Sequence, residues 1–359
     1  MKTFEEIFTD KTKYGVKVQT SEYGKRGKYI IIDQGQSQIA GYTDREEGVF
    51  EELPVIVFGD HTRTIKYVDK PFFLGADGVK VLRSKDSNAN YKYLYYALKS
   101  AKIPDTGYNR HFKWLKKIQI NYPDNNRQEE IVQILDKVSD IIKSRESELS
   151  ALDELIIARF VEMFGDPVAN PKGLIKKTLP ELGEFGRGVS KHRPRNDEAL
   201  LGGPYPLIQT GDVANSGLYI TEYHSTYSEL GLQQSKMWDE GTLCITIAAN
   251  IAKTAILGFD ACFPDSIVGF IANEDTNNVF VHYWFSFFQE ILESQAPESA
   301  QKNINLKILS ELKVIVPNIQ EQNEFADFVV QVEKTKDTIQ KSLDETQILF
   351  DSLMQKYFG

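Results

Sequence analysis

Two stretches of this chain repeat one another, and they decide its fold. Residues 123–165 are PDNNRQEEIVQILDKVSDIIKSRESELSALDELIIARFVEMFG, and residues 317–359 are PNIQEQNEFADFVVQVEKTKDTIQKSLDETQILFDSLMQKYFG. They align without a gap at an offset of 194, and the alignment extends upstream to residues 109 and 303. Such a duplication predicts a chain of two related halves with an internal pseudo-two-fold repeat. The identical pairs are Asn109/Asn303, Lys113/Lys307, Leu115/Leu309, Pro123/Pro317, Gln128/Gln322, Glu130/Glu324, Val138/Val332, Leu149/Leu343, Leu155/Leu349, Phe164/Phe358 and Gly165/Gly359.

Each copy begins with a short alternating run, at residues 118–122 and 312–316, which is typical of a strand that a proline ends. Polar residues then mark a helix start. Asn126 with Glu129, and Asn318 with Glu321, have the spacing of a capping box. Neither copy contains another proline or glycine before its closing glycine. We therefore expect one long helix in each copy.

The apolar residues of both helices recur at spacings of three and four, the pattern of a coiled-coil seam. A helix of this length measures about 58 Å at 1.5 Å per residue. Its apolar stripe needs a partner, and the other copy is the obvious one. The sequence thus predicts two long antiparallel helices that hold two globular heads apart. The seam residues are Ile131, Leu135, Val138, Ile142, Leu149, Leu152, Ile156, Phe160 and Met163, and Phe325, Val329, Val332, Ile339, Leu343, Phe350, Leu353 and Tyr357.

The repeat divides the chain into four parts: a first head, 1–122, a central helix, 123–166, a second head, 167–316, and a C-terminal helix, 317–359. Both heads are predicted to be mixed α/β, so the fold class is α+β. Each also has an aromatic helical stretch, at 91–102 and 281–294, whose rings we assign to the core. The expected strands are 29–32, 55–58, 79–82, 205–208, 243–247 and 267–271.

The net charge of −9 conceals an uneven distribution along the chain. Residues 1–122 hold 21 Lys and Arg against 15 Asp and Glu, whereas the two helical parts are acidic. The second head is also acidic overall, but it carries a local basic cluster at 187–195. Basic surface attracts nucleic acid, and acidic helices suit a protein interface or solvent. The charge therefore permits DNA at the heads and disfavours it along the helices.

Loops between the expected strands are rich in side chains that suit DNA. Arginine pairs with guanine, and Gln or Asn pairs with adenine, while Lys, Ser and Thr can hold phosphates. Solvated polar loops have the same composition, so the basic clusters at 61–66 and 187–195 are the stronger candidates. The candidate DNA-binding residues are Gln34, Gln36, Ser37, His61, Thr62, Arg63, Thr64 and Lys66 in the first head, and Arg187, Lys191, His192, Arg193, Arg195, Gln209, Thr210, Gln234, Asn250 and Lys253 in the second.

Motifs for catalysis are missing from the sequence. There is no phosphate-binding loop and no metal-ligand spacing, since the five histidines are scattered and Cys244 and Cys262 lie far apart. Asp166-Pro167 and Asn170-Pro171 lack the second proline and the aromatic residue of the adenine methyltransferase motif. We predict no catalytic residue and no metal site. The two cysteines are expected to be free thiols.

Two variable heads, each followed by a long helix from a near-repeat, resemble the specificity subunits of type I restriction-modification systems. The run Arg127-Gln128-Glu129-Glu130 after Pro123, with Glu321-Gln322 after Pro317, is similar to that family's helix entry. Met163 to Pro167 resembles the usual end of its central helix. Residues 29–41, 59–66 and 72–78 resemble a recurring type of target recognition domain. The likeness covers essentially the whole chain.

The resemblance implies a mechanism. Each head would recognise one half of a bipartite double-stranded DNA site, and the helices would act as a ruler for the gap between the halves. Two methyltransferase subunits would dock on the helices and heads, and restriction subunits would join through them. This chain would bind no cofactor, because S-adenosylmethionine, ATP and magnesium would be held by the partners.

Two alternatives remain open at this point. One is the recognition part of a fused type II methyltransferase or nuclease, against which the missing motifs argue. The other is a coiled-coil scaffold whose heads bind protein or glycan. No apolar run is long enough to span a bilayer, and the acidic start has no signal-peptide core, so we expect a cytoplasmic protein without a membrane partner.

Overall fold

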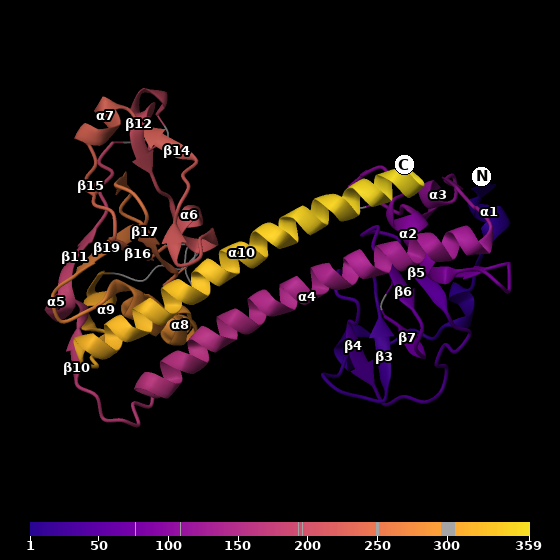
Figure 1. Ribbon diagram of the computed structural model, residues 1–359, viewed down its shortest axis with the longest axis horizontal. Coiled ribbons are helices and arrows are strands. Elements are labelled where there is room, and N and C mark those ends of the chain that lie inside the picture. The colour runs from indigo at the N-terminus through magenta and orange to yellow at the C-terminus, as the bar shows by residue number, and fades with distance from the viewer. Residues whose placement is uncertain (76, 108, 193, 196, 249–250, 296–305) are drawn as a thin grey trace. The chain divides into compact units, whose positions relative to one another are not determined.

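The computed structural model describes residues 1–359 except 76, 108, 193, 196, 249–250 and 296–305, and of residues 290–295 it describes the backbone alone (Figure 1). The two predicted long helices are present as α4 (Asn125–Phe164, magenta) and α10 (Ile319–Phe358, yellow). The chain forms two compact units, residues 1–147 with 340–359 and residues 148–339. Each unit contains one head and a segment of both long helices.

The head of the first unit contains a sheet of strand order β2-β8-β5-β6 and a smaller sheet of order β4-β3-β7 (Figure 1). A third pair, β1 with β9, joins the start of the head to its end. The strands are β1 (Lys2–Thr3), β2 (Phe8–Asp10), β3 (Tyr29–Ile32), β4 (Gly41–Thr43), β5 (Val55–Gly59), β6 (Ile65–Val68), β7 (Phe72–Leu74), β8 (Val79–Ser84) and β9 (Gln119–Ile120). The helices are α1 (Phe4–Ile7), α2 (Tyr91–Lys99) and α3 (Phe112–Leu115), and the 3-10 turns are η1 (Thr12–Tyr14) and η2 (Thr20–Glu22).

Strand β5 shows how the first head forms its core. Successive side chains of a strand point to opposite faces. Ile56 and Phe58 accordingly pack on α2 and the long helices, whereas Val55 and Val57 pack against the small sheet. All four are fully buried. The head is therefore layered, with helices on one face of the larger sheet and the small sheet on the other.

The second unit repeats this plan. Its larger sheet has the order β11-β19-β16-β17-β13, its smaller sheet the order β14-β12-β18-β15, and β10 pairs with β20. The strands are β10 (Lys176–Thr178), β11 (Gly183–Arg187), β12 (Leu201–Leu207), β13 (Tyr219–Ile220), β14 (Ser225–Tyr227), β15 (Met237–Trp238), β16 (Leu243–Thr246), β17 (Thr254–Leu257), β18 (Ala261–Cys262), β19 (Ile267–Ala272) and β20 (Lys313–Ile315). The helices are α5 (Leu179–Leu182), α6 (Thr210–Asn215), α7 (Glu229–Gln233), α8 (Asn278–Gln295) and α9 (Leu306–Glu311), with a 3-10 turn, η3 (Glu198–Leu200).

The likeness between the heads extends to strand direction, which the sequence repeat does not cover. In the first small sheet, β3 is antiparallel to β4 and parallel to β7. In the second, β12 is antiparallel to β14 and parallel to β18. Strand β16, like β5, sends alternate residues to two cores, Leu243 and Ile245 toward the helices and Cys244 toward the small sheet. The heads are therefore structural repeats, although their sequences differ.

Each unit contains its own contact between the long helices. In the first unit, Leu135 and Val138 of α4 share a core with Phe350 and Met354 of α10. In the second, Ile156 and Phe160 of α4 share a core with Phe325 and Val329 of α10. The start of α4 thus lies against the end of α10, and the end of α4 lies against its start. The predicted antiparallel packing of the two helices is confirmed.

The starts of the long helices confirm one predicted cap and correct the other. Asn318 caps α10, since its Oδ1 accepts the Glu321 N–H at 2.9 Å. In the first copy, however, the cap is Asp124, whose Oδ1 accepts the Arg127 N–H at 3.0 Å. Asn126 lies inside the helix, so its prediction as the cap was wrong. Asp124 is the residue that the offset of 194 pairs with Asn318.

Each helix start is also fixed by a fully buried glutamine. Gln128 Nε2 donates to the carbonyl of Pro123 at 2.8 Å, and Gln322 Nε2 donates to the carbonyl of Pro317 at 2.9 Å. Gln322 makes two further bonds to the loop before α8, with the Asn277 N–H at 3.0 Å and the Asp275 carbonyl at 3.1 Å. The proline and the glutamine of the repeat thus form one structural element.

Both cysteines are buried free thiols, as predicted. Burial raises the pKa of the Cys244 and Cys262 thiols, so both stay protonated at neutral pH. Across the described residues, we find no helix with the length and apolar character needed to cross a membrane.

Candidate nucleic-acid interface

In the first head, three loops that follow or precede neighbouring strands meet at Gln34. Its backbone carbonyl accepts bonds from the hydroxyls of Thr62, at 2.6 Å, and Thr64, at 3.0 Å. Its side-chain Oε1 accepts the His61 N–H at 3.2 Å, and its Nε2 donates to the Asp77 carbonyl at 3.0 Å. The β3–β4, β5–β6 and β7–β8 loops are therefore linked into one surface, which brings together candidates that are distant in sequence.

Glycines allow this close approach of the loops. A Cβ on Gly59 would lie 2.3 Å from the Thr62 hydroxyl, and a Cβ on Gly75 would lie 2.4 Å from Asp33. Gly78 has a φ of +94°, where side chains are strained, and it lies against the Gln34 amide. The loop cluster depends on these small residues.

Lys66 has a structural position that the sequence did not indicate. Its side chain is only 3% exposed, and its Nζ donates to the Ser37 carbonyl at 2.6 Å and lies 3.5 Å from the Asp33 carboxylate. Burial lowers the pKa of Lys66, while Asp33 acts in the opposite direction. A direct contact between Lys66 and phosphate does not fit this burial. We conclude that Lys66 positions the β3–β4 loop.

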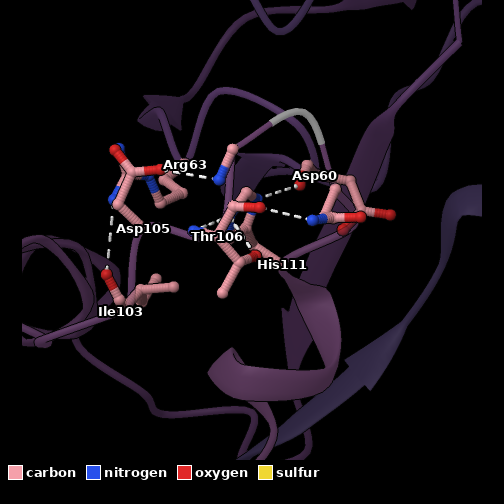
Figure 2. Close-up of polar contacts among 8 residues, drawn as sticks. Asp60, Arg63, Ile103, Asp105, Thr106 and His111 are labelled. Atoms are coloured by element: carbon pink, nitrogen blue, oxygen red, sulfur yellow. Dashed lines mark hydrogen bonds and ion pairs between the residues drawn. The ribbon is translucent and has the colours of Figure 1, made fainter.

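Arg63 lies at the edge of the loop cluster with a positive φ of 62°. Its guanidinium donates to the Asp105 carboxylate at 2.7 Å and to the Ile103 carbonyl at 3.5 Å, and the side chain remains 34% exposed (Figure 2). A bond from the Gly107 N–H, followed by the charge of Arg63, holds the pKa of Asp105 below its usual range. Arg63 is thus held in a fixed direction and is still within reach of solvent.

Asp60, at the end of β5, anchors the segment behind this loop (Figure 2). Its carboxylate accepts the Phe112 N–H at 2.7 Å, and its backbone carbonyl accepts the His111 N–H at 2.8 Å. His111 is fully buried and also meets the Thr106 hydroxyl at 3.3 Å. Sequence reasoning missed Asp60 and His111, because a buried Asp or His cannot be told from an exposed one in a polar loop. It missed the exposed Asp105 because its partner, Arg63, is distant in sequence.

The other candidates of the first head lie on the same loops. Gln36 and Ser37 are exposed on the β3–β4 loop, and Thr62 is exposed on the β5–β6 loop. His61 and Thr64 are half-buried beside it. Exposed amide and hydroxyl groups on rigid loops can bond to base edges and phosphates. The first head therefore presents a compact polar surface with Arg63 at its border.

In the second head, the β11–β12 loop that carries the basic cluster is held by Gln234. Its Oε1 accepts the N–H groups of Lys191, at 2.7 Å, and His192, at 3.0 Å. The His192 ring also meets Asp197 at 3.1 Å. Gln234 is thus placed to position the loop, while the side chains of Lys191 and His192 are exposed.

Arg195, Gln209 and Thr210 come from different segments and line one cavity of about 260 Å³. Gln209 and Thr210 form the start of α6, where the Gln209 N–H donates to Asp212 at 2.8 Å. Arg195 forms an ion pair with Asp265. Ser225, Tyr227 and Ser266 complete the polar part of the wall. This cavity is the place where the second head gathers predicted residues.

The remaining candidates of the second head are less concentrated. Arg187 is exposed at the end of β11. Lys253 is exposed and lines another cavity, together with His282 and Lys336. Arg193 and Asn250 lie outside the described residues. Gln234, as shown above, supports a loop.

The chemistry of both surfaces is that of binding. They consist of amides, hydroxyls and basic side chains on loops that the sheets hold in place. Within the part of the chain that the structure describes, no group of three or more His, Cys, Asp or Glu is placed to hold a metal ion.

The sequence matches the family of the type I restriction modification DNA specificity domain over residues 2–152 and 171–347. This chain belongs to that family. The two matched regions correspond to the two halves of the repeat, so the family assignment and the internal duplication agree.

Curated relatives are named as specificity subunits. The chain is 26% identical to the type I restriction enzyme EcoR124I/EcoR124II specificity subunit of Escherichia coli, over 93% of this chain and 85% of that protein. It is 23% identical to the putative type I specificity subunit S.MgeORF438P of Mycoplasma genitalium, over 92% of this chain and 87% of that protein.

Solved structures share the fold. The S subunit of a type I restriction-modification system from M. genitalium superimposes with a TM-score of 0.63 at 19% identity, covering 100% of this chain and 95% of that one. A chain from a structure of type I restriction-modification complex assembly has a TM-score of 0.57 at 16% identity, covering 99% and 96%. The predicted α+β architecture with two long helices is confirmed.

Proposed function

We propose that this specificity subunit recognises a bipartite DNA site, with each head binding one half of it. DNA sequence recognition is the role of the family to which the chain belongs. One observation supports two half-sites. The two heads have the same strand plan, and one pair of candidate residues has corresponding positions, with Gln34 two residues after the end of β3 and Gln209 two residues after the end of β12. Two equivalent but chemically different surfaces suit two different half-sites.

We further propose that two methyltransferase subunits dock on the long helices. Leu155 and Leu349 are equivalent in the repeat and are 45% and 50% exposed. Phe328 lies beside Leu155 in one unit, and Ile134, its equivalent, is 39% exposed in the other. Exposed apolar residues at matched positions favour two copies of one protein partner. Restriction subunits would join through those partners.

The catalytic chemistry is proposed to belong to the partners. The methyltransferase subunits would bind S-adenosylmethionine and methylate adenine, and the restriction subunits would use ATP and magnesium. This chain would contribute recognition alone and bind no cofactor. We propose the cytoplasm as the place where the complex acts on DNA.

Methylation sequencing of cells that express this chain with its methyltransferase tests the division of labour. Arg63→Glu is expected to weaken methylation that depends on one half-site, and Arg195→Glu to weaken methylation that depends on the other, each by at least tenfold. Lys70→Glu, which makes the same change of charge at an exposed residue between β6 and β7, is the control. If both head variants changed the same half-site, the proposal would be wrong.

We also propose that the helix length sets the spacer between the half-sites. Four residues, about one helical turn, are inserted into both α4 and α10 near their midpoints. The methylated sites should then keep both half-site sequences and change the number of bases between them. If the number of bases between the half-sites did not change, the proposal that helix length sets the spacer would be wrong. If the chain bound no duplex DNA, alone or with a methyltransferase, a scaffold with protein- or glycan-binding heads would become the better proposal.

A further inference from the structure

A basic segment that was not among the candidates lies directly behind the first head's loop cluster. We call residues 102–117, apart from residue 108, the basic strap. It carries Lys102, Arg110, Lys113, Lys116 and Lys117 against one acidic residue, Asp105. Asp105 is paired with Arg63. The strap therefore has a clear positive excess next to a polar surface.

The strap is attached to the loop cluster by buried hydrogen bonds. Asp60, which directly precedes the β5–β6 loop, holds both His111 and Phe112. Asp105 holds Arg63 from the same strap (Figure 2). Phe112 is buried against Phe4 and Phe58, so the strap also shares the core of the head. Its basic side chains are thus fixed relative to the loop residues 61–64.

The basic residues of the strap are exposed, and three of its lysines lie over aromatic rings. Lys113 and Lys117 lie over the Trp114 ring, at 5.5 Å and 4.9 Å from its centroid. Lys116 lies 5.2 Å from the Phe112 ring centroid. A ring supports the stem of a lysine while its ammonium stays in water. These ammonium groups are free to meet an anion.

Arg110 is a further basic residue of the strap. It is exposed, and its charge acts on Asp77 of the β7–β8 loop. Lys17, through a hydrogen bond and its charge, is the main cause that holds the pKa of Asp77 low, and Arg110 adds to this effect. The backbone carbonyl of Asp77 in turn accepts a hydrogen bond from the side-chain amide of Gln34.

The fold itself does not require this charge. The offset of 194 pairs Lys113, Lys116 and Lys117 with Lys307, Ser310 and Glu311 in the second unit. There the remaining lysine lies 3.8 Å from Glu311 in an ion pair. The corresponding short helices, α3 and α9, thus have the same place in the repeat but different charge. A purely structural role would not explain why only the first unit carries the excess.

We propose that Arg110, Lys113, Lys116 and Lys117 contact DNA phosphates that flank the half-site of the first head. The inference rests on the proposed DNA-binding function and adds to it a sequence-independent contact. Phosphate contacts fix the register of a protein on the duplex, whereas base contacts give specificity. The strap therefore sets affinity, and the loop cluster beside it sets the sequence.

The test measures how the affinity of the full-length chain for a duplex depends on salt, with a duplex that contains the methylated site and one that lacks it. The variant carries Gln at Arg110, Lys113, Lys116 and Lys117. The slope of log affinity against log salt is negative, and each lost phosphate contact reduces its magnitude by about 0.9. We expect the magnitude of this slope to fall by about 3.6 and the affinity to fall at least tenfold on both duplexes. Thermal unfolding should be unchanged, because the four side chains are exposed.

Matched variants distinguish the possible outcomes. Gln at the exposed Lys137, Lys143, Lys334 and Lys341 of the long helices removes the same charge and should leave the slope unchanged. A variant with Arg at Lys113, Lys116 and Lys117 should keep the wild-type slope. An unchanged slope in the Gln strap variant, while the wild type binds DNA, overturns the inference and leaves the proposed function intact. Loss of methyltransferase binding without a change in slope also overturns it, because the strap would then be a protein surface. If the wild type bound neither duplex, both proposals would fail.

Discussion

The two heads share one strand plan but make their polar surfaces differently. In the first head, Gln34 and Lys66 hold the loops together from within, so one candidate from the stronger basic cluster, Lys66, and one weaker candidate, Gln34, support other residues. In the second, Gln234 holds the basic loop by its backbone, and Arg195, Gln209 and Thr210 surround a cavity. The difference teaches that residue type alone does not identify a DNA contact. In this protein, burial distinguishes the residues that support a polar surface from the exposed residues that can contact DNA.

The largest expected effect concerns the buried glutamines that the two units share. Gln322→Leu would leave the Pro317 and Asp275 carbonyls and the Asn277 N–H without partners, which should cost about 3 kcal/mol of unfolding free energy at roughly 1 kcal/mol per lost bond. Gln128→Leu removes the bond to Pro123 and should cost about 1 kcal/mol. Urea unfolding followed by tryptophan fluorescence measures both. Equal costs would show that the added bonds of Gln322 contribute nothing.

The second expected effect is a pH dependence in the second unit. His282 lines a cavity, and burial, with the charge of Lys336, lowers its pKa to about 4 from 6.5. Between pH 6.5 and 4 the unfolded state therefore binds more protons, so stability falls as the pH drops through this window. We expect a loss of about 2 kcal/mol, reduced from the full shift because His282 is only half-buried.

Tryptophan positions allow this pH effect to be assigned. Trp238 and Trp284 lie in the second unit and Trp114 in the first. In a Trp114→Phe background, fluorescence reports the second unit alone, and His282→Gln should remove most of the acid sensitivity. If the His282→Gln protein lost stability between pH 6.5 and 4 as steeply as the parent, another group would be responsible.

The third effect concerns Lys66. Lys66→Met keeps the apolar stem but removes the ammonium that bonds to the Ser37 carbonyl and faces Asp33. The β3–β4 loop should lose its fixed position, and affinity for the first half-site should fall about tenfold, or roughly 1.4 kcal/mol. Binding to the second half-site should be unchanged. The salt dependence of binding distinguishes the two roles of Lys66. If Lys66 only positions the loop, the substitution leaves the slope of log affinity against log salt unchanged. If Lys66 contacts a phosphate, the substitution reduces the magnitude of this slope by about 0.9.

The smallest effect is expected at Gln234, which holds the basic loop of the second head by hydrogen bonds. Gln234→Ala removes the acceptor of the Lys191 and His192 N–H groups, but these groups lie near solvent and water can replace it. We expect about a threefold loss of affinity for the second half-site, measured by titration against duplexes that vary in one half at a time. A tenfold loss of affinity would mean that the second head depends on Gln234 as strongly as the first head depends on Lys66.

The long helices could be predicted from the sequence because their signals are periodic and repeated. The seam residues Leu135, Phe160, Phe325 and Val329 are all fully buried. The six strands expected in the heads were also located, as β3, β5, β8, β12, β16 and β19, with ends that differ by a few residues, whereas other strands such as β4, β6 and β11 were not predicted. The pairing of β1 with β9 was missed, because its two members lie more than a hundred residues apart and each is very short.

The candidate site was predicted less completely than the fold. The sequence located the loops at 33–38, 59–66, 186–195 and 209–212, and the structure brings residues of these loops together within each head. It did not separate Lys66 from Arg63, since both are basic residues in one polar stretch. Whether a side chain is buried depends on residues that are distant in sequence. The Lys66 side chain is buried and meets Ser37 and Asp33 on another loop. The cap at Asp124 was missed for a different reason: local spacing was given more weight than the repeat, which pairs this residue with Asn318.

The joints between heads and helices have a consequence for inheritance. Each head is entered through a strand and a Thr–Glu capping box, Thr3 with Glu6 and Thr178 with Glu181, and is left through the paired strand, β9 or β20. Because both joints are alike, recombination between them could exchange one head for another as a cassette. A chimaera that received a relative's head between these joints should direct methylation by the proposed partner to a hybrid site. New specificities could then arise without any change in the helices on which we propose that the partners dock.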